Sequence, residues 1–348
     1  MRKPVTGLVL LLLPLAATGC GGSGSGAPPR PVQAELHTGR EVGPPVVAAG
    51  AVWVPNEADG TISRIDPATN RVVATIRVGD PQQLVAAGCG PGSVHSFMYD
   101  TLLNRRCDLP TSIAGDARSV WAADTAAQGL ARIDPATNRV VQRVDLGAPP
   151  FAIALGYGSL WVTSYFHDPH EVLRVDPVAG RVVDAITDLP FDGGTGIAIG
   201  AGAVWVTCTY ARSVARIDPA TDRVTATIPT ERYPLAVNVG RSGVWVRNEE
   251  SSSVSHLDPG TNRVTATVRG ISPPVGRPGD DAMALGPEGL WVTGVQLLLV
   301  DPVRNRVKAK IDLSGNGISE GFGSLWMTSI VGTVQRIDPR SAVPNQAG

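Results

Sequence analysis

The chain has 348 residues, of which 43% are hydrophobic and 5% aromatic, and its 30 basic residues nearly balance its 31 acidic residues. Proteins that bind nucleic acids generally carry a basic excess on one face. This charge balance therefore excludes general nucleic-acid binding, and the order of the residues has to indicate the kind of protein.

The first nineteen residues have the features of an export signal. Arg2 and Lys3 precede an apolar run at 8–17, which is too short to span a bilayer as a helix. Small residues lead to Cys20, an order that resembles the lipobox of bacterial lipoprotein signals; an ordinary secretory signal is the alternative. The resemblance implies a lipid on Cys20 and anchoring on the outer side of the cell membrane. Residues 20–31, rich in Gly, Ser and Pro, are expected to be a flexible linker.

The remaining chain repeats one short phrase around each of its seven tryptophans. These are Trp53, Trp121, Trp161, Trp205, Trp245, Trp291 and Trp326. Within one unit, segments of about five to seven residues at 150–156, 159–163, 171–176 and 181–186 are rich in β-branched or aromatic residues. Four such strands every forty residues are typical of a propeller blade. The sequence predicts an all-β, seven-bladed β-propeller at 32–340, followed by a tail at 341–348. The tryptophans are expected to pack between blades rather than to stack on a ligand.

The turn between the third and fourth strands has a nearly constant sequence, Asp-Pro-Ala-Thr-Asn at 66–70 and 134–138. Its fifth position is Asn70, Asn138, Gly180, Asp222, Asn262 and Asn305 in successive units. Asn, Gly and Asp tolerate a left-handed backbone, so this position is predicted to have positive φ. The first Asp is expected to accept bonds from the turn itself rather than to bind metal. His256 stands where most units have arginine and is interpreted as a structural substitute.

The seventh unit lacks a fourth strand, and the N-terminal region supplies a match for it. Residues 31–39 align without gaps on 71–79, so residues 32–37 are predicted to complete the last blade and close the ring. The first unit contains an insertion at about 82–108. It carries Cys89 and Cys107, which we expect to form a disulfide; two free thiols, and a degenerate eighth blade in the insertion, are the alternatives. Cys208 is interpreted as a buried small hydrophobic residue.

The segment 50–79, GAVWVPNEADGTISRIDPATNRVVATIRVG, resembles the YVTN-type β-propeller repeats of bacterial surface and periplasmic proteins. It also resembles the repeats of the streptogramin B lyase family, and the likeness extends over residues 32–340. Membership of the lyase family would imply a magnesium-dependent elimination that opens a cyclic depsipeptide at an ester bond.

The candidate site residues lie in the loops that differ from unit to unit. In a propeller, the loops from second to third strand and from blade to blade share one face, where ligands usually bind. Predicted for that face are Asn56, Glu57, Tyr165, His167, Asp168, Tyr210, Arg212, Arg232, Tyr233, Arg247, Glu249, Asp280 and Asp281. The group at 167–171 is the densest, and His167, His170 and Glu171 are its candidates for acid–base chemistry or metal binding. Asp280 and Asp281 could ligate Mg²⁺ together with other groups, with an exposed loop as the alternative. A solvated polar loop is the alternative.

Two functions follow from these observations. The first is a lipid-anchored, non-catalytic binding platform outside the cytoplasm, whose partner is an envelope protein or a small ligand. The second is an enzyme of the streptogramin lyase type that requires Mg²⁺. No Walker loop, Gly-x-Gly-x-x-Gly, Cys-x-x-Cys or Gly-x-Ser-x-Gly motif points to another enzyme class.

Overall fold

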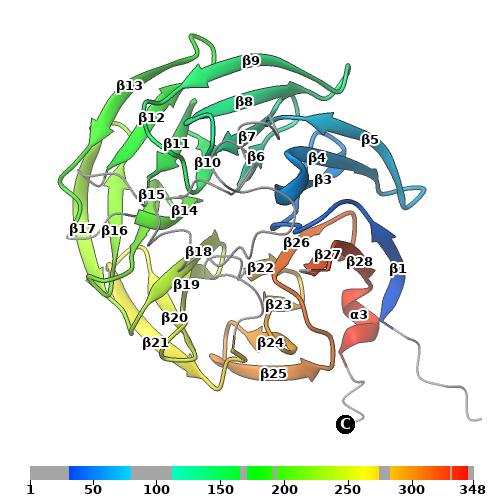
Figure 1. Cartoon of the computed structure of the whole chain (residues 1–348). Coiled ribbons are helices and arrows are strands. Elements are labelled where there is room, and N and C mark those ends of the chain that lie inside the picture. The colour runs from blue at the N-terminus through cyan, green and yellow to red at the C-terminus, as the bar shows by residue number, and fades with distance from the viewer. Residues whose placement is uncertain are drawn as a thin grey trace, which may run out of the picture.

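Seven four-stranded antiparallel sheets are arranged in a ring (Figure 1). The computed structural model describes residues 31–79, 112–164, 171–190, 194–273, 283–329 and 331–343. The predicted seven-bladed β-propeller is therefore confirmed. The export signal, Cys20, residues 21–30 of the linker and the insertion with Cys89 and Cys107 lie outside the described residues, so the predicted disulfide stays a prediction. No helix among the described residues is long and apolar enough to cross a membrane.

Each of blades 1–6 takes its four strands from the innermost to the outermost in chain order. Blade 1 consists of β2 (Val46–Ala48), β3 (Ala51–Asn56), β4 (Thr61–Asp66) and β5 (Arg71–Arg77), with the 3₁₀ turn η1 (Glu57–Asp59) after β3. Blade 2 consists of β6 (Ile113–Gly115), β7 (Val120–Asp124), β8 (Gly129–Asp134) and β9 (Arg139–Asp145). Blade 3 consists of β10 (Ile153–Gly156), β11 (Ser159–Thr163), β12 (Val172–Asp176) and β13 (Arg181–Ile186). Blade 4 consists of β14 (Gly194–Gly200), β15 (Ala203–Cys208), β16 (Ser213–Asp218) and β17 (Arg223–Pro229).

The last three blades include the one that closes the ring. Blade 5 consists of β18 (Pro234–Gly240), β19 (Gly243–Asn248), β20 (Ser253–Asp258) and β21 (Arg263–Arg269). Blade 6 consists of β22 (Met283–Gly286), β23 (Gly289–Val292), β24 (Leu297–Asp301) and β25 (Arg306–Ile311). Blade 7 consists of β26 (Gly317–Gly321), β27 (Ser324–Ser329), β28 (Thr333–Ile337) and, from the N-terminal end, β1 (Val32–His37). Leu36 pairs with Val334, and β1 lies beside β28 in Figure 1, as the sequence match predicted.

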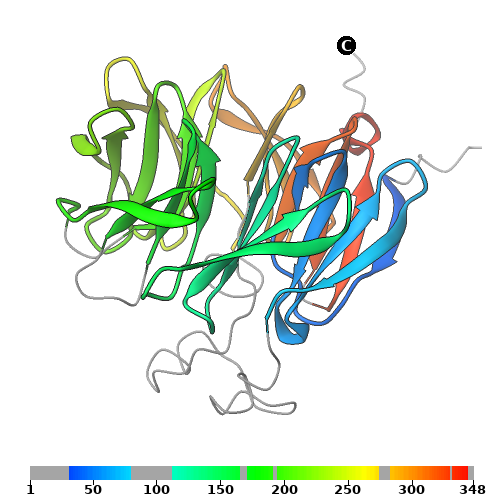
Figure 2. The ribbon, with the colours of Figure 1, turned by 90° about the horizontal axis from the view of Figure 1, so that it is seen from above.

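The ring has two faces that differ in their loops. The turn face carries the turns from first to second strand and from third to fourth strand, the latter at 67–70, 135–138, 177–180, 219–222, 259–262 and 302–305. The variable face carries the loops from second to third strand, such as 57–60, 125–128, 209–212 and 249–252, and the connections between blades. Figure 2 shows the ring edge-on, with the short helix α3 (Pro339–Ala342, red) on the turn face.

The turns from third to fourth strand have the predicted left-handed residue. Its φ is 53° at Asn70, 55° at Asn138, 65° at Gly180 and 56° at Asp222. The first Asp stabilises the turn as expected, since the Asp66 carboxylate accepts bonds from the Ala68 N–H and the Thr69 hydroxyl. These bonds favour the charged form and lower the pKa of Asp66. The repeated aspartates are thus part of the turns.

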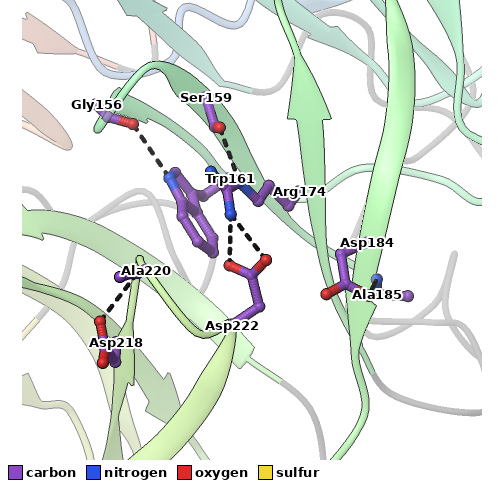
Figure 3. Close-up of polar contacts among 9 residues, drawn as sticks. All are labelled: Gly156, Ser159, Trp161, Arg174, Asp184, Ala185, Asp218, Ala220 and Asp222. Carbon is purple, nitrogen blue, oxygen red and sulfur yellow. Dashed lines mark hydrogen bonds and ion pairs between the residues drawn. The ribbon is translucent and has the colours of Figure 1, made fainter.

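The tryptophans pack between blades, as predicted. All seven indoles are at most 1% exposed, and Trp161 donates from Nε1 to Gly156 O at 3.2 Å, at the end of the first strand (Figure 3). An arginine of the third strand covers the ring; the Arg174 guanidinium carbon lies 5.3 Å from the Trp161 centroid. Arg174 then reaches the next blade and binds both Asp222 carboxylate oxygens at 2.9 and 2.7 Å (Figure 3). The left-handed turn residue therefore also serves as the acceptor for the preceding blade.

We call this contact, in which a third-strand side chain binds the left-handed turn residue of the next blade, the latch. It recurs around the ring, and where one partner differs the other differs with it. Arg64 binds Asn138, Arg216 binds Asn262, and across the closure Arg336 binds Asn70. His256 stacks on Trp245 with 3.9 Å between ring centroids and contacts Asn305 through Nδ1 at 2.7 Å, so it replaces the arginine as interpreted from the sequence. In blade 6 the latch position is Leu299, which belongs to one apolar cluster with Ala342 of α3. Both partners of that latch are therefore apolar.

The Arg174–Asp222 pair is expected to contribute measurably to stability. Its side chains are 24% and 14% exposed, and the guanidinium makes two bonds to the carboxylate. A double-mutant cycle with Arg174→Ala and Asp222→Gly, since glycine is found at the same left-handed position as Gly180, should give a coupling energy of about 1.5 kcal/mol in urea unfolding, as for a hydrogen-bonded charged pair. The exposed Arg232–Glu250 pair on the variable face is the control and should give less than about 0.5 kcal/mol. Equal coupling in the two cycles would contradict the latch.

Candidate functional site

The variable face is built on a buried polar layer at the ends of the second strands. The third residue after each tryptophan is Asn56, Asp124, Ser164, Cys208, Asn248, Gly294 or Ser329. Asn56 and Asn248 are fully buried, and each donates through Nδ2 to two hydroxyls, Thr61 and Ser63 in blade 1 and Ser253 and Ser255 in blade 5. The predicted residue Asn56 thus supports the loop that follows it.

Cys208 and Asp124 occupy the same layer and differ in their chemistry. Cys208 is a free, fully buried cysteine, and burial raises the pKa of its thiol to about 11. A thiol that stays protonated and buried is a poor nucleophile. Asp124 is 2% exposed, and burial raises its pKa even though it accepts bonds from the Ala127 N–H and Arg143. The sequence interpretation missed Asp124, although aligning the units on tryptophan places it opposite Asn56 and Asn248.

A chain of threonine hydroxyls links blades 3, 4 and 5 beneath the variable face. The Thr195 hydroxyl lies 2.9 Å from that of Thr207 and 2.8 Å from that of Thr209. The Thr163 hydroxyl donates to Thr195 O, and the Thr209 hydroxyl donates to Pro234 O. These bonds join the inner ends of three neighbouring blades. The recurring Trp-Val-Thr sequence indicates where such threonines lie. Their hydrogen bonds cross between blades, however, so the sequence of one unit does not predict them.

An aromatic and charged group lies on the variable face of blades 4 and 5. Tyr210 is 57% exposed and meets Tyr233 edge to face, with 5.8 Å between ring centroids and 86° between planes. Beside them, Arg232 pairs with Glu250 at 3.0 Å, and both side chains are exposed. The structure thus brings together Tyr210, Tyr233 and Arg232 from the predicted set. Tyrosines and arginines are common in binding surfaces.

Other predicted residues hold loops in place. Arg247 is 1% exposed and donates to Thr293 O at 2.6 Å and to Ser272 O at 3.1 Å, so it joins blade 5 to blade 6. Glu57 is 6% exposed, and its N–H donates to Glu41 O. Arg212 ends its loop with φ of 51°, and the Glu249 N–H donates to Tyr233 O. Their backbones or buried side chains order the variable face.

The acid–base chemistry or metal binding predicted for the loop at 165–171 depends mostly on residues outside the described ranges. These are Tyr165, His167, Asp168 and His170. Asp280 and Asp281, predicted for another loop of the same face, also lie outside the described ranges. Glu171, at the end of that loop, is half-buried. Within the described ranges, no group of three or more His, Cys, Asp or Glu side chains could hold a metal ion.

Comparison with known proteins relates the chain to other propellers through structure alone. No protein-family model and no curated protein sequence matches it. Among solved structures, it is similar to selenomethionine-substituted virginiamycin B lyase from Staphylococcus aureus, with TM-score 0.65 and 15% identity over 88% of this chain and 98% of that one. It is similar to the β-propeller domain of Cps50 (Swd1) from Myceliophteria thermophila, with TM-score 0.66 and 12% identity over 88% and 98%. The WD40 β-propeller domain of Doa1 gives TM-score 0.66 and 10% identity over 90% and 98%. These similarities establish the β-propeller fold.

Proposed function

We propose that the protein is a non-catalytic binding platform, anchored by a lipid on Cys20 outside the cytoplasm. One observation carries the proposal: a regular ring supports one face whose chemistry changes from blade to blade. The turn face repeats the same Asp-Pro turn, whereas the variable face presents Tyr210, Tyr233 and the Arg232–Glu250 pair on two adjacent blades. Aromatic rings beside charged groups suit recognition of an envelope protein or a small ligand. Anchoring by Cys20 would hold the ring close to the membrane surface.

The platform can be tested by placing a photo-crosslinking amino acid on each face. p-Benzoylphenylalanine at position 210 is expected to give a discrete crosslinked adduct in cells of the source organism. The same residue at position 303 is the control, because Val303 is 84% exposed and lies in a turn of the opposite face. Crosslinking that is equal at both positions, or absent at 210, would contradict the proposal. In the same cells, Cys20→Ser should move the protein from the membrane fraction to the aqueous fraction, and continued membrane association would refute the lipid anchor.

A lyase of the streptogramin B type is the second candidate. The observation that favours it is the structural similarity to virginiamycin B lyase over 88% of this chain. Under this hypothesis, His167, His170 and Glu171 act in acid–base chemistry with Mg²⁺. Incubation with a streptogramin B and Mg²⁺, followed by mass spectrometry, would reveal the linear product. Turnover that is lost in His167→Ala or His170→Ala would replace the non-catalytic proposal, and absence of turnover would eliminate the lyase.

A further inference from the structure

The N-terminal segment enters the ring on the turn face. Val32, the first residue of β1, pairs with Ile337 at the end of β28, and the Asp338 N–H donates to Pro31 O at 2.9 Å. In Figure 1, β1 begins beside α3, which lies on the turn face. The expected linker at 20–30 therefore precedes a point on this face. Because a flexible chain of that length spans about 20 Å on average, a lipid on Cys20 would hold the turn face close to a membrane.

Exposed arginines stand along the outer rim of the same face. The fourth strand of each of blades 1–6 begins with an arginine directly after the turn: Arg71, Arg139, Arg181, Arg223, Arg263 and Arg306. All six are exposed, and none forms an ion pair with another described residue. The same strands end on the variable face with Arg77, Asp145, Ile186, Pro229, Arg269 and Ile311. Only the turn face thus has a uniformly basic rim.

The aspartates of the turns lie next to these arginines but bond within the turns. Asp66 is the cross-strand neighbour of Arg71, and its carboxylate accepts bonds from the Ala68 N–H and the Thr69 hydroxyl. Asp66 is half-buried, whereas Arg71 is exposed. An anionic group outside the protein can therefore reach the guanidinium, while the carboxylate is already occupied.

Two aromatic side chains occupy strained positions on the turn face. Tyr157 and Phe322 are the first residues of turns from first to second strand, with φ of 51° and 56°, and each is 44% exposed. In blades 1 and 4 the same position is Ala49 and Ala201, with φ of 47° and 50°. A left-handed backbone is unfavourable for a bulky residue, and alanine is sufficient for the turn. The turn itself therefore does not explain these two rings, and such strain is found where a surface has a function.

The two most exposed large hydrophobic side chains of the described residues lie on this face as well. Val178 and Val303 are 86% and 84% exposed, and they occupy the third position of the Asp-Pro turn, which is alanine or glycine in blades 1, 2, 4 and 5. Val178 belongs to blade 3, as does Tyr157, and Val303 belongs to blade 6, next to the blade of Phe322. Figure 1 shows blade 3 across the ring from blades 6 and 7. The turn face therefore presents apolar groups at two opposite sides of the ring.

We propose that the turn face lies flat on an anionic phospholipid bilayer, with the variable face directed away from it. The inference rests on the lipid anchor of the proposed function, which would bring this face to the membrane. The six arginines of the rim would bind lipid phosphates. Tyr157 and Phe322 would enter the headgroup region, where aromatic rings are favoured, and Val178 and Val303 would be buried beside them. The variable face would then be open to partners outside the membrane.

The orientation is tested with the lipidated full chain in vesicles of phosphatidylglycerol and phosphatidylcholine. p-Benzoylphenylalanine at position 322 should crosslink to radiolabelled phospholipid. The same residue at position 295 should not, because Val295 is 48% exposed but lies on the variable face. Equal lipid labelling at both positions, or none at 322 in protein that floats with the vesicles, would overturn the orientation and leave the anchor intact. Failure of the unsubstituted chain to float would instead refute the anchor.

The membrane-binding surface is measured separately in Cys20→Ser, which cannot carry the lipid. This variant should still bind the anionic vesicles, and high salt should weaken the binding because it screens the arginines. Adding Tyr157→Ala and Phe322→Ala should weaken vesicle binding without lowering the midpoint of urea unfolding, since alanine is found in the equivalent turns. Absence of vesicle binding by Cys20→Ser, or unchanged binding after removal of both rings, would refute the surface.

Paired arginine substitutions in Cys20→Ser assign the binding to one face. Arg139→Gln together with Arg181→Gln should weaken vesicle binding at least about tenfold, because each arginine near an anionic membrane contributes to affinity. Arg77→Gln together with Arg212→Gln removes the same charge from the variable face and should have no effect. Glutamine is found at the left-handed position equivalent to Arg212, as Gln128. Equal weakening by the two pairs would contradict the proposal, and circular dichroism of each variant detects any loss of folding.

Discussion

Replacing Trp205 with alanine is expected to lower the free energy of unfolding by about 3–5 kcal/mol, the usual cost of removing a buried large aromatic side chain. The indole is fully buried in a cluster that contains Val214 and Ile228 of its own blade and Val244 and Leu257 of the next. Its loss would open a cavity between two blades that neighbouring strands cannot refill. Urea unfolding followed by circular dichroism measures the change. A loss below about 1 kcal/mol would show that Trp205 is not a packing element.

A comparison of two phenylalanine variants separates the indole bond from the packing. Trp205 donates to Gly200 O at 3.0 Å, whereas Trp291 has no acceptor. Trp205→Phe should therefore cost about 1 kcal/mol more than Trp291→Phe, because only the former breaks a hydrogen bond. The same difference tests whether the Trp291 Nε1 donor lacks a hydrogen-bond partner in the folded protein. Equal losses of stability in the two variants would show that Trp205 and Trp291 do not differ in hydrogen bonding.

Substituting Leu36 with aspartate is expected to destabilise the closed ring by more than about 3 kcal/mol. Leu36 pairs with Val334 and packs in one cluster with Trp326 and Val52, which belong to blades 7 and 1. A carboxylate at this position either enters an apolar layer or forces β1 away from β28. The second outcome would expose an unpaired strand edge that favours aggregation. Urea unfolding measures the destabilisation, and light scattering detects the aggregates.

The neighbouring residue provides the control for ring closure. Exposed Glu35 lies on the opposite side of β1, where its carboxylate accepts a bond from half-buried Gln335 at 2.9 Å. Glu35→Ala should change the stability by less than about 0.5 kcal/mol, because it removes only a surface contact. Similar losses for Leu36→Asp and Glu35→Ala would contradict closure by the apolar side of β1. Limited proteolysis within 32–37 in Leu36→Asp alone would identify release of the strand.

The architecture was predictable because it depends on local signals that recur. The spacing of tryptophan marks every second strand, and Asn70 or its equivalents mark every tight turn. The match between the N-terminal segment and 71–79 placed β1 correctly in the last blade, where it pairs with β28. Departures from the repeated pattern are harder to explain from the sequence. Leu299 breaks the arginine pattern, and its reason lies at Ala342 in another blade, which only packing reveals.

The candidate site was predictable as a face but not as a set of contacts. Chain order places the loops of Tyr210 and Tyr233 on the same side, yet their edge-to-face contact depends on the angle between two blades. Arg247 reads as a surface residue from its position at the end of a strand, but its side chain is buried between blades. Glu320 of blade 7 lies close to Gly286 of blade 6, which is also a contact between blades. Such contacts depend on distances across the ring.

The latch from Arg174 to Asp222, and from Arg336 back to Asn70, belongs to a set of contacts that gives blades 1 and 4 a donor on one side and an acceptor on the other. A blade copied in register would therefore meet both neighbours with complementary groups already in place. Tandem duplication of a gene segment could lengthen such an array without inventing a new interface. The pair of Leu299 and Ala342 is different, because neither residue matches the common partner. Blades 6 and 7 therefore fit each other, and neither of them could be exchanged alone for another blade of the ring.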